Sequence, residues 1–182
     1  RRRVVAVVSA LGSTTDELLG AARQLVASPH PSSLAALLAT GETTAAALLT
    51  LALQRSGIPA ALLDAAAAGL RTRGDALDAE PVALDTESIR RALATGSVVV
   101  VPGFSGRDDA GATTLLGRGG SDLTAVFLAR ELGAACTLLK DVDGVCAEDP
   151  AARPDAPRFA SITWRRAVRV GRGVVQPKAL RL

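Results

Sequence analysis

Residues 102–124, PGFSGRDDAGATTLLGRGGSDLT, decide how this chain folds and where it binds a ligand. They follow a β-branched run at 97–101 that is typical of a strand buried on both faces, and they lead into an apolar-periodic helix at 123–132. Glycines between a buried strand and a helix start let backbone N–H groups approach an anion closely, and the helix N-terminus adds partial positive charge. The hexapeptide GRGGSD at 117–122 also contains Arg, Ser and Asp. The segment therefore predicts a site for a phosphate or a carboxylate.

On either side of this segment, strand-like runs alternate with helix-like ones. Expected strands are 4–9, 60–63, 81–85, 97–101 and 135–139, and expected helices are 18–26, 33–54, 86–94, 123–132 and 163–170, with 71–80 as an exposed connection. This alternation predicts an α/β fold, a three-layer α/β/α sandwich with a mostly parallel central sheet. Ligands of such folds bind beyond the carboxyl ends of the strands, so the polar turns there can converge on one crevice.

The composition sets limits on the class of protein. With 182 residues, 48% of them hydrophobic, the chain suits a single domain with a real core. The net charge is +3, but only 2% of residues are aromatic, which argues against nucleic-acid binding. No uninterrupted apolar run looks long enough to cross a membrane and no signal peptide is visible, so we expect no membrane partner and a cytoplasmic protein.

The two cysteines and the one histidine suggest no metal site. Cys136 and Cys146 form no disulfide framework and lack the spacing of metal ligands. Cys136 lies in an apolar run and is expected to be a small core residue. His30 stands between two prolines with no partner in the sequence and is expected at the surface. The chain has no Met and opens on Arg1, so we expect it to be the interior of a longer polypeptide.

Three constellations carry candidate chemistry, each with a plainer alternative. GRGGSD is neither a Walker A motif nor GxGxxG, but the planar fork of Arg118 suits an anion, and Asp122 either caps the helix or orders neighbouring cations and donors. The stretch KDVDGVCAEDP at 140–150 is either an Asp/Gly-rich turn or a nucleotide loop, with Asp141 and Asp143 placed for hydroxyl groups or a metal. Glu42, in an apolar helical stretch that glycine interrupts, is either a solvated residue or an acceptor for a substrate ammonium.

Taken in order, these segments resemble the catalytic domain of the aspartate kinases, in the amino acid kinase superfamily. The matching pieces are VVSALGSTTDELL (7–19), LLATGETTAAALL (37–49), VVVPGFSG (99–106), TTLLGRGGSDLTAV (113–126), KDVDGVCAEDP (140–150) and GVVQPKAL (173–180). They run nearly end to end in the family's order, and TTLLGRGGSD is among its most specific markers. The resemblance implies one amino acid kinase domain over 1–182, incomplete at both ends and without a regulatory domain.

The resemblance also implies a reaction and a set of site residues. ATP, accompanied by Mg²⁺, would phosphorylate the side-chain carboxylate of L-aspartate, giving 4-phospho-L-aspartate and ADP, in a full-length enzyme that is a homo-oligomer. By matched position, Asp122 and Arg118 would be catalytic. The aspartate site would comprise Ser9, Thr15, Asp16, Glu42, Phe104, Arg118, Gly119, Gly120 and Ser121. The ATP side would comprise Lys140, Asp141, Cys146, Ala147, Glu148, Asp149, Pro150, Gly173 and Val174.

The chain also departs from the family pattern. The family's first strand, with its Lys-Phe-Gly-Gly motif, has no match here, and neither do its final helix and strand. Lys140 stands where the family commonly has Thr, Cys146 where it has Tyr, and Gly173 where a basic residue is common. We therefore expect weak kinase activity from residues 1–182 alone. Two alternatives stay open: a degenerate subunit that binds nucleotide or amino acid, and a sister kinase acting on another carboxylate, a carbamate or a phosphate.

Overall fold

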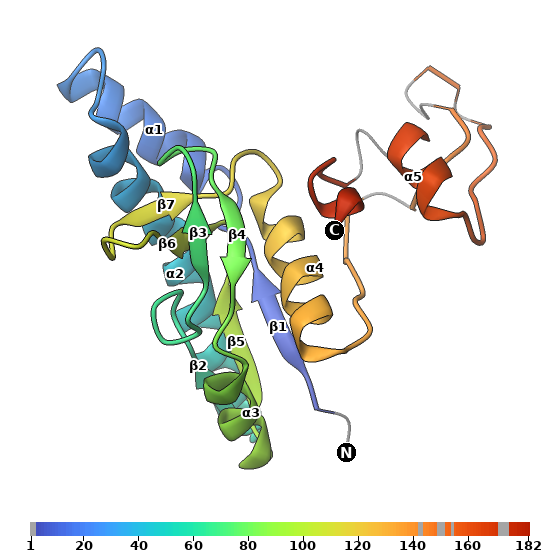
Figure 1. The fold of residues 1–182 in the computed structure, drawn as a ribbon, viewed down its shortest axis with the longest axis horizontal. Coiled ribbons are helices and arrows are strands. Elements are labelled where there is room, and N and C mark those ends of the chain that lie inside the picture. The colour runs from blue at the N-terminus through green and yellow to red at the C-terminus, as the bar shows by residue number, and fades with distance from the viewer. Residues whose placement is uncertain (1–2, 142–143, 149–151, 154, 171–174) are drawn as a thin grey trace.

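The protein folds around two small β-sheets with helices packed on them (Figure 1). The computed structural model describes residues 3–141, 144–148, 152–153, 155–170 and 175–182. The strands are β1 (Val5–Val8), β2 (Ala60–Leu62), β3 (Arg71–Arg73), β4 (Glu80–Ala83), β5 (Val98–Pro102), β6 (Ser105–Arg107) and β7 (Thr113–Leu115). The helices are α1 (Thr14–Leu25), α2 (Pro31–Arg55), α3 (Thr86–Ala94), α4 (Gly120–Leu132) and α5 (Trp164–Val170), and a 3-10 turn η1 covers Ala179–Arg181.

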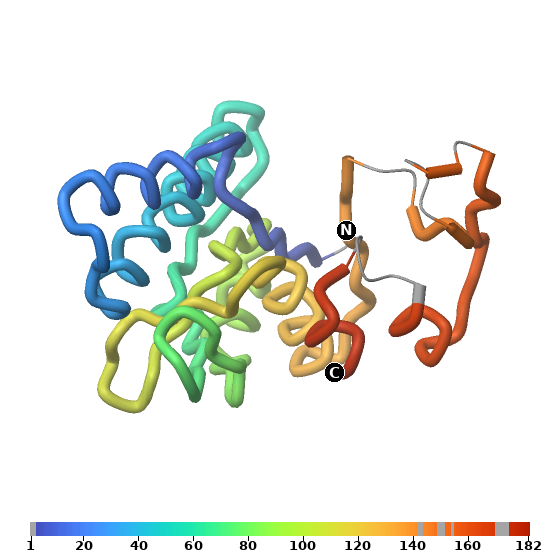
Figure 2. The backbone as a smooth tube through the Cα atoms, turned by 90° about the horizontal axis from the view of Figure 1, so that it is seen from above, coloured from blue at the N-terminus to red at the C-terminus, as the bar shows by residue number. Residues whose placement is uncertain are grey.

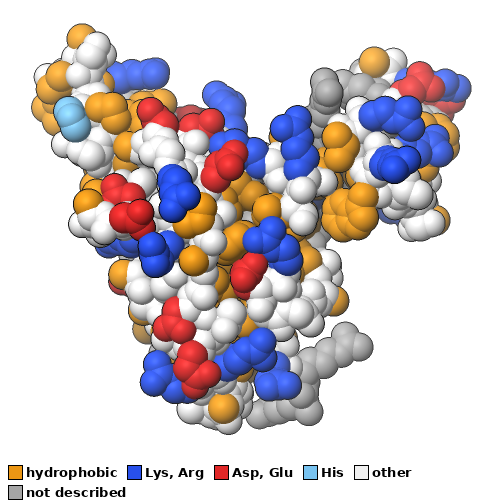
Figure 3. Space-filling model, in the orientation of Figure 1, with side chains coloured by type: hydrophobic (Ala, Val, Ile, Leu, Met, Phe, Trp, Pro, Cys, Tyr) orange, Lys and Arg blue, Asp and Glu red, His pale blue; other side chains and the backbone are white. Residues whose placement is uncertain are grey.

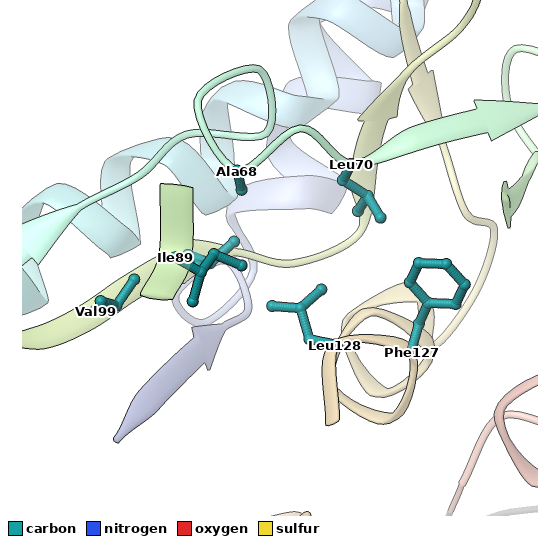
Figure 4. Packing of buried hydrophobic residues seen from close by; sticks show 7 residues of the cluster. Ala68, Leu70, Ile89, Val99, Phe127 and Leu128 are labelled. Atoms are coloured by element: carbon teal, nitrogen blue, oxygen red, sulfur yellow. The ribbon is translucent and has the colours of Figure 1, made fainter. Parts of the chain in front are cut away.

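The first sheet is parallel throughout, in the order β1-β5-β2, and it confirms the expected architecture. Its central strand β5 is buried because helices cover both of its faces. Val99 and Val101 point to one side, where they pack with residues of α3 and α4, and α2 packs against the same sheet. Figure 4 shows this cluster, with Ile89 of α3 beside Val99 and with Leu128 and Phe127 of α4 on its other side. The result is the predicted α/β/α sandwich.

The second sheet, in the order β4-β3-β6-β7, was not expected from the sequence. Residues 71–80 form strand β3 and the approach to β4 rather than an exposed connection, and the hairpin β6–β7 lies inside the glycine-rich segment. These strands are three or four residues long, so alternation is hard to recognise in them. Thr72 in β3 is fully buried, which shows that this segment is not exposed. Its hydroxyl group forms a hydrogen bond with the hydroxyl group of Thr114 at 2.5 Å.

Helix α2 is continuous through Gly41, where the sequence suggested an interruption. Glycine serves there as a close contact, because a Cβ on Gly41 would lie 3.0 Å from the Cβ of Ala10. By length and composition alone α2 could cross a membrane, contrary to the expectation from the sequence, although core helices of soluble proteins pass the same test. In the structure it packs against α1 and against strands of both sheets.

The starts of α3 and α1 are capped differently. The Asp85 carboxylate caps α3, since it accepts from the backbone N–H groups of Glu87 and Ser88. Helix α1 begins at Thr14, and its N-cap residue, Ser13, makes no side-chain capping bond.

The expected strand at 135–139 is absent, and this error also misplaced Cys136. No strand in the described part of the chain pairs with this apolar run, which follows the left-handed Gly133 that ends α4. Cys136 is therefore exposed rather than part of the core. Beyond residue 140 the chain leaves the α/β body and then returns, so that η1 lies beside α4 (Figure 2).

Candidate functional site

The predicted anion-binding turn lies between β7 and α4, and two left-handed glycines shape it. Gly117 has φ 74° and Gly119, the N-cap of α4, has φ 71°. A Cβ on Gly117 would overlap Oδ1 of Asp78. The turn is closed by backbone bonds from the N–H of Gly120 to the carbonyl of Gly117 (3.0 Å) and from that of Asp122 to Gly119 (3.1 Å). Both φ values and the lack of space require glycine, and Arg118 between them is left exposed.

A buried threonine ties this turn to the end of β5. Thr124 Oγ1 accepts from the backbone N–H of Phe104 (3.1 Å) and donates to the carbonyl of Gly120 (2.9 Å). Phe104 is held at φ 66°, which non-glycine residues seldom adopt and which often marks a functional site. Its ring lies against Gly120, where a Cβ would come within 2.8 Å of it. Thr124 was not among the residues predicted for the site. The feature that could have indicated it is a hydroxyl side chain within the apolar pattern of α4.

The carboxyl ends of β1 and β5 bring the remaining acceptor-side residues to the same edge. Val8 pairs with Pro102, and the carbonyl of Val8 accepts from the N–H of Gly103 at 2.9 Å. Ser121 packs on Gly103 so closely that a Cβ there would lie 2.6 Å from its Oγ. Ser9 follows β1 directly and is exposed, whereas Thr15 and Asp16 lie in the first turn of α1, with Thr15 half-buried and Asp16 exposed.

Glu42 lies at this edge and is buried, so the interpretation as a solvated surface residue is wrong. Only 4% of the residue is exposed. Its Oε1 accepts from the backbone N–H of Ala10 at 3.3 Å, whereas Oε2 is buried and has no hydrogen-bond partner among the described residues. Burial raises the pKa of Glu42 above its ordinary value, because desolvation disfavours the charged form more than the Ala10 bond favours it. A buried carboxylate oxygen without a donor is suited to a ligand that carries one.

Asp122 does not cap its helix and instead forms an ion pair with Lys140. No side-chain capping bond is made at the start of α4. The ammonium of Lys140 lies 2.6 and 2.7 Å from the two carboxylate oxygens of Asp122, which is 9% exposed. The pair joins two motifs that the sequence suggested separately, and it places a cation beside the first turn of α4.

The expected ATP side is built differently, because its described residues 140–141 and 144–148 lie in loop segments rather than in helices or sheet strands. Cys146 pairs with Arg158 in an isolated antiparallel bridge, and Ala147 donates to the carbonyl of Pro157 at 3.0 Å. Glu148 pairs with Arg153 at 2.5 Å, and Asp141 is exposed. The candidates Asp143, Asp149, Pro150, Gly173 and Val174 lie outside the described residues.

The surface around these segments mixes both signs of charge. Figure 3 shows Lys and Arg side chains interspersed with Asp and Glu over the α/β body, and a hollow between that body and the segment that carries α5. Within the described ranges, no group of three or more His, Cys, Asp and Glu side chains could hold a metal ion.

A parallel sheet between helices, with a glycine turn beyond its strand ends, is an α/β architecture in which small ligands bind at the strand-end edge. The chain belongs to the amino acid kinase family, whose model matches residues 1–182. It is 41% identical over 181 residues to an aspartokinase of Bacillus sp. (strain MGA3), covering 97% of this chain and 44% of that protein. The chain thus spans less than half the length of this relative.

Solved structures give the same family. An aspartate kinase from Synechocystis matches with a TM-score of 0.79 and 36% identity, over 97% of this chain and 30% of that one. Aspartokinase III of E. coli, in complex with aspartate and ADP, matches with a TM-score of 0.74 and 27% identity, over 91% of this chain and 38% of that one.

Proposed function

We propose that this chain is the catalytic segment of an aspartate kinase, which transfers the γ-phosphoryl group of ATP to the side-chain carboxylate of L-aspartate. The observation that carries the proposal is the buried Oε2 of Glu42, which has no partner in the described part of the chain and lies at the strand-end edge where the GRGGSD turn also lies. An amino acid substrate offers an ammonium to the first and a carboxylate to the second. The named relatives support aspartate as that amino acid.

The acceptor side would bind aspartate through complementary charges. Arg118 would take a carboxylate with its guanidinium fork, and Glu42 would accept from the ammonium. Gly119, Gly120 and Ser121 would donate beside Arg118, and Phe104 would pack against the substrate. Ser9, Thr15 and Asp16 would line the opposite wall, since they follow β1.

ATP would occupy the loop side with Mg²⁺ on its phosphates. The residues for this role are Lys140, Asp141, Cys146, Ala147 and Glu148 among those described, with Asp149, Pro150, Gly173 and Val174. An oxygen of the aspartate side chain attacks the γ-phosphorus, and the bond from that phosphorus to the bridging oxygen of ADP breaks. No covalent enzyme intermediate is needed, because the chemistry depends on positioning and on charge stabilisation.

Asp122 and Lys140 would act where the two sides meet. The Asp122 carboxylate fixes the Lys140 ammonium by two short bonds. A fixed cation next to a helix N-terminus can stabilise the negative charge that spreads over the transferred group. We expect the full-length enzyme to be a cytoplasmic homo-oligomer.

The test is a coupled assay of ADP release on the full-length polypeptide, with aspartate present or absent and with hydroxylamine to trap the acyl phosphate. Aspartate-dependent ADP release with formation of the hydroxamate is the expected result. ADP release that ignores aspartate would assign the chain to a sister kinase with another acceptor. Nucleotide binding without turnover would make it a degenerate binding subunit.

A further inference from the structure

The C-terminal residues 175–182 return to the body and contact the glycine turn, and nothing in the proposed reaction uses them. The turn η1 packs against α4, and Ala179 is buried in a cluster with Leu116 and Leu123, which flank the turn on either side. Two polar side chains of this segment, Gln176 and Lys178, bond to residues some sixty to a hundred positions earlier in the chain.

Gln176 holds the start of the turn. Its Nε2 donates to the carbonyl of Leu116 at 3.0 Å, and its side chain lies over Gly119, where a Cβ would come within 3.0 Å of the Gln176 Cβ. The carbonyl of Leu116 also needs fixing, because the backbone reverses into the left-handed region at the next residue, Gly117. The other amide atom of this side chain, Oε1, is buried and has no hydrogen-bond partner among the described residues. The bond from Nε2 to Leu116 is therefore the polar contact that orients the side chain.

Lys178 holds the opposite side of the turn through Asp78. Its ammonium donates to Oδ1 of Asp78 at 2.8 Å and to the backbone carbonyl of the same residue at 3.3 Å. The same Oδ1 occupies the space where Gly117 would carry a Cβ. Asp78 also pairs with Leu116 in an isolated antiparallel bridge. Lys178 therefore fixes the carboxylate that packs on the first glycine of the turn.

We propose that Gln176 and Lys178 are positioning residues for phosphoryl transfer, which hold the 117–120 turn in the shape that presents Arg118 and Ser121 to the carboxylate of aspartate. This inference rests on the proposed function for its substrate, but the contacts are independent of it.

A merely structural role would be different in its consequences. If the two side chains only fasten the C-terminal segment, removing them lowers the melting temperature and impairs the use of both substrates alike. A positioning role instead changes the KM for aspartate selectively. If the residues position the turn, removing them also exposes the turn amides of Gly120, Asp122 and Leu123 to exchange with solvent, because the hydrogen bonds of these amides close the turn.

The experiment uses Lys178→Met and Gln176→Leu in the full-length protein. We expect each to raise the KM for aspartate about tenfold, as for the loss of one hydrogen bond to a charged or fixed group, with the KM for ATP within about twofold. Lys178→Arg, which keeps the charge, should recover most of the loss. The matched control is Arg71→Met, which breaks an exposed 2.6 Å ion pair with Asp109 on the same sheet and should leave both KM values unchanged.

Hydrogen exchange of the turn amides is the second readout, and it needs no activity. Faster exchange at Gly120, Asp122 and Leu123 in Lys178→Met, but not in Arg71→Met, supports the proposal even if the wild type does not phosphorylate aspartate. In that case only the proposed function fails. Unchanged exchange in both Lys178→Met and Gln176→Leu, or equal rises in the KM values for aspartate and ATP, would overturn the positioning role.

Discussion

The acceptor half and the nucleotide half of the proposed site are built in different ways. The acceptor half belongs to the core: Thr124 is fully buried, Glu42 and Asp122 nearly so, and each bonds to a residue that is distant in the chain. The described nucleotide half is a loop whose contacts include the isolated Cys146–Arg158 bridge and the ion pair Glu148–Arg153, whose side chains are 55% and 52% exposed.

This difference has a consequence for substitution. In the acceptor half, the proposed residues Glu42 and Asp122 lie in the packed interior, so a substitution there is expected to change stability as well as function, whereas Arg118 is exposed. In the nucleotide half, exposed side chains can be replaced at little cost to folding. The Asp122–Lys140 pair is the described contact that joins the two halves, and the substitutions below test the contrast.

The largest effect is expected at Asp122. Asp122→Asn preserves the shape of the side chain but removes the charge that fixes the Lys140 ammonium, so kcat should fall by about 10³-fold or more. Steady-state kinetics at saturating aspartate and ATP measures this. Lys140→Met should reduce kcat to a similar level, and the double variant should be no worse, since the two groups act as a unit.

Asp109→Asn is the matched control for this experiment, because it removes a carboxylate from an exposed ion pair away from the turn. It should leave kcat unchanged. Near-normal turnover in Asp122→Asn would show that the Asp122–Lys140 pair is structural only.

The next effect is expected at Arg118. Arg118 is exposed between two left-handed glycines and has no partner in the described structure to lose, so Arg118→Ala should change stability by less than about 0.5 kcal/mol. The KM for aspartate should rise about 100-fold, because the substrate carboxylate loses its charged fork. Arg118→Lys should restore part of the affinity. Arg73→Ala, at another exposed arginine, should have no effect; an unchanged KM in Arg118→Ala would remove Arg118 from the site.

Much of the fold could be predicted from the sequence, and the elements that were not predicted were missed for physical reasons. The apolar or periodic elements β1, β5, α2, α3 and α4 were recognised, because burial on one or both faces produces a clear hydrophobic pattern in the sequence. The second sheet was missed since its strands are too short to alternate, and the apolar run at 135–139 was misjudged because a strand also needs a neighbour to pair with.

The candidate site shows the same limit. The sequence motifs placed Arg118 and Asp122 at the glycine turn before α4. Contacts between residues that are distant in the chain, however, cannot be predicted from local sequence. Nothing in the pattern joined Asp122 to Lys140, Asp78 to Lys178, or Phe104 to Thr124, and only the fold brings these side chains together.

A smaller effect, with opposite signs for function and stability, is expected at Glu42. Glu42→Gln removes a buried charge without a partner on Oε2, so the free energy of unfolding at neutral pH should rise by about 1 kcal/mol. The KM for aspartate should rise about tenfold, since the ammonium loses its acceptor. Chemical denaturation and steady-state kinetics measure the two quantities.

The pH dependence of Glu42 gives this prediction a second check. Because folding raises the pKa of Glu42 above 4.5, the protonated form stabilises the fold at low pH, and this stabilisation is lost as pH rises through the folded pKa. The KM for aspartate should change in the other direction, rising as pH falls through that pKa and the acceptor is neutralised. Glu42→Gln should flatten both dependences; a wild-type KM that is constant with pH while Glu42→Gln binds normally would exclude the ammonium role.

The smallest effect is expected at Glu148, the matched carboxylate of the nucleotide half. Its ion pair with Arg153 is more than half exposed, and Arg153 keeps a second partner in Asp155 at 3.3 Å, so Glu148→Gln should change the free energy of unfolding by less than about 0.5 kcal/mol. The KM for ATP should change by no more than about threefold and the KM for aspartate not at all, because no described bond leads from Glu148 to the glycine turn. Denaturation curves and the two KM values, taken beside those of Glu42→Gln, complete the contrast. A stability loss as large as that of a core substitution would mean that the loop is integrated into the body after all, and the division into a packed acceptor half and a peripheral nucleotide half would be wrong.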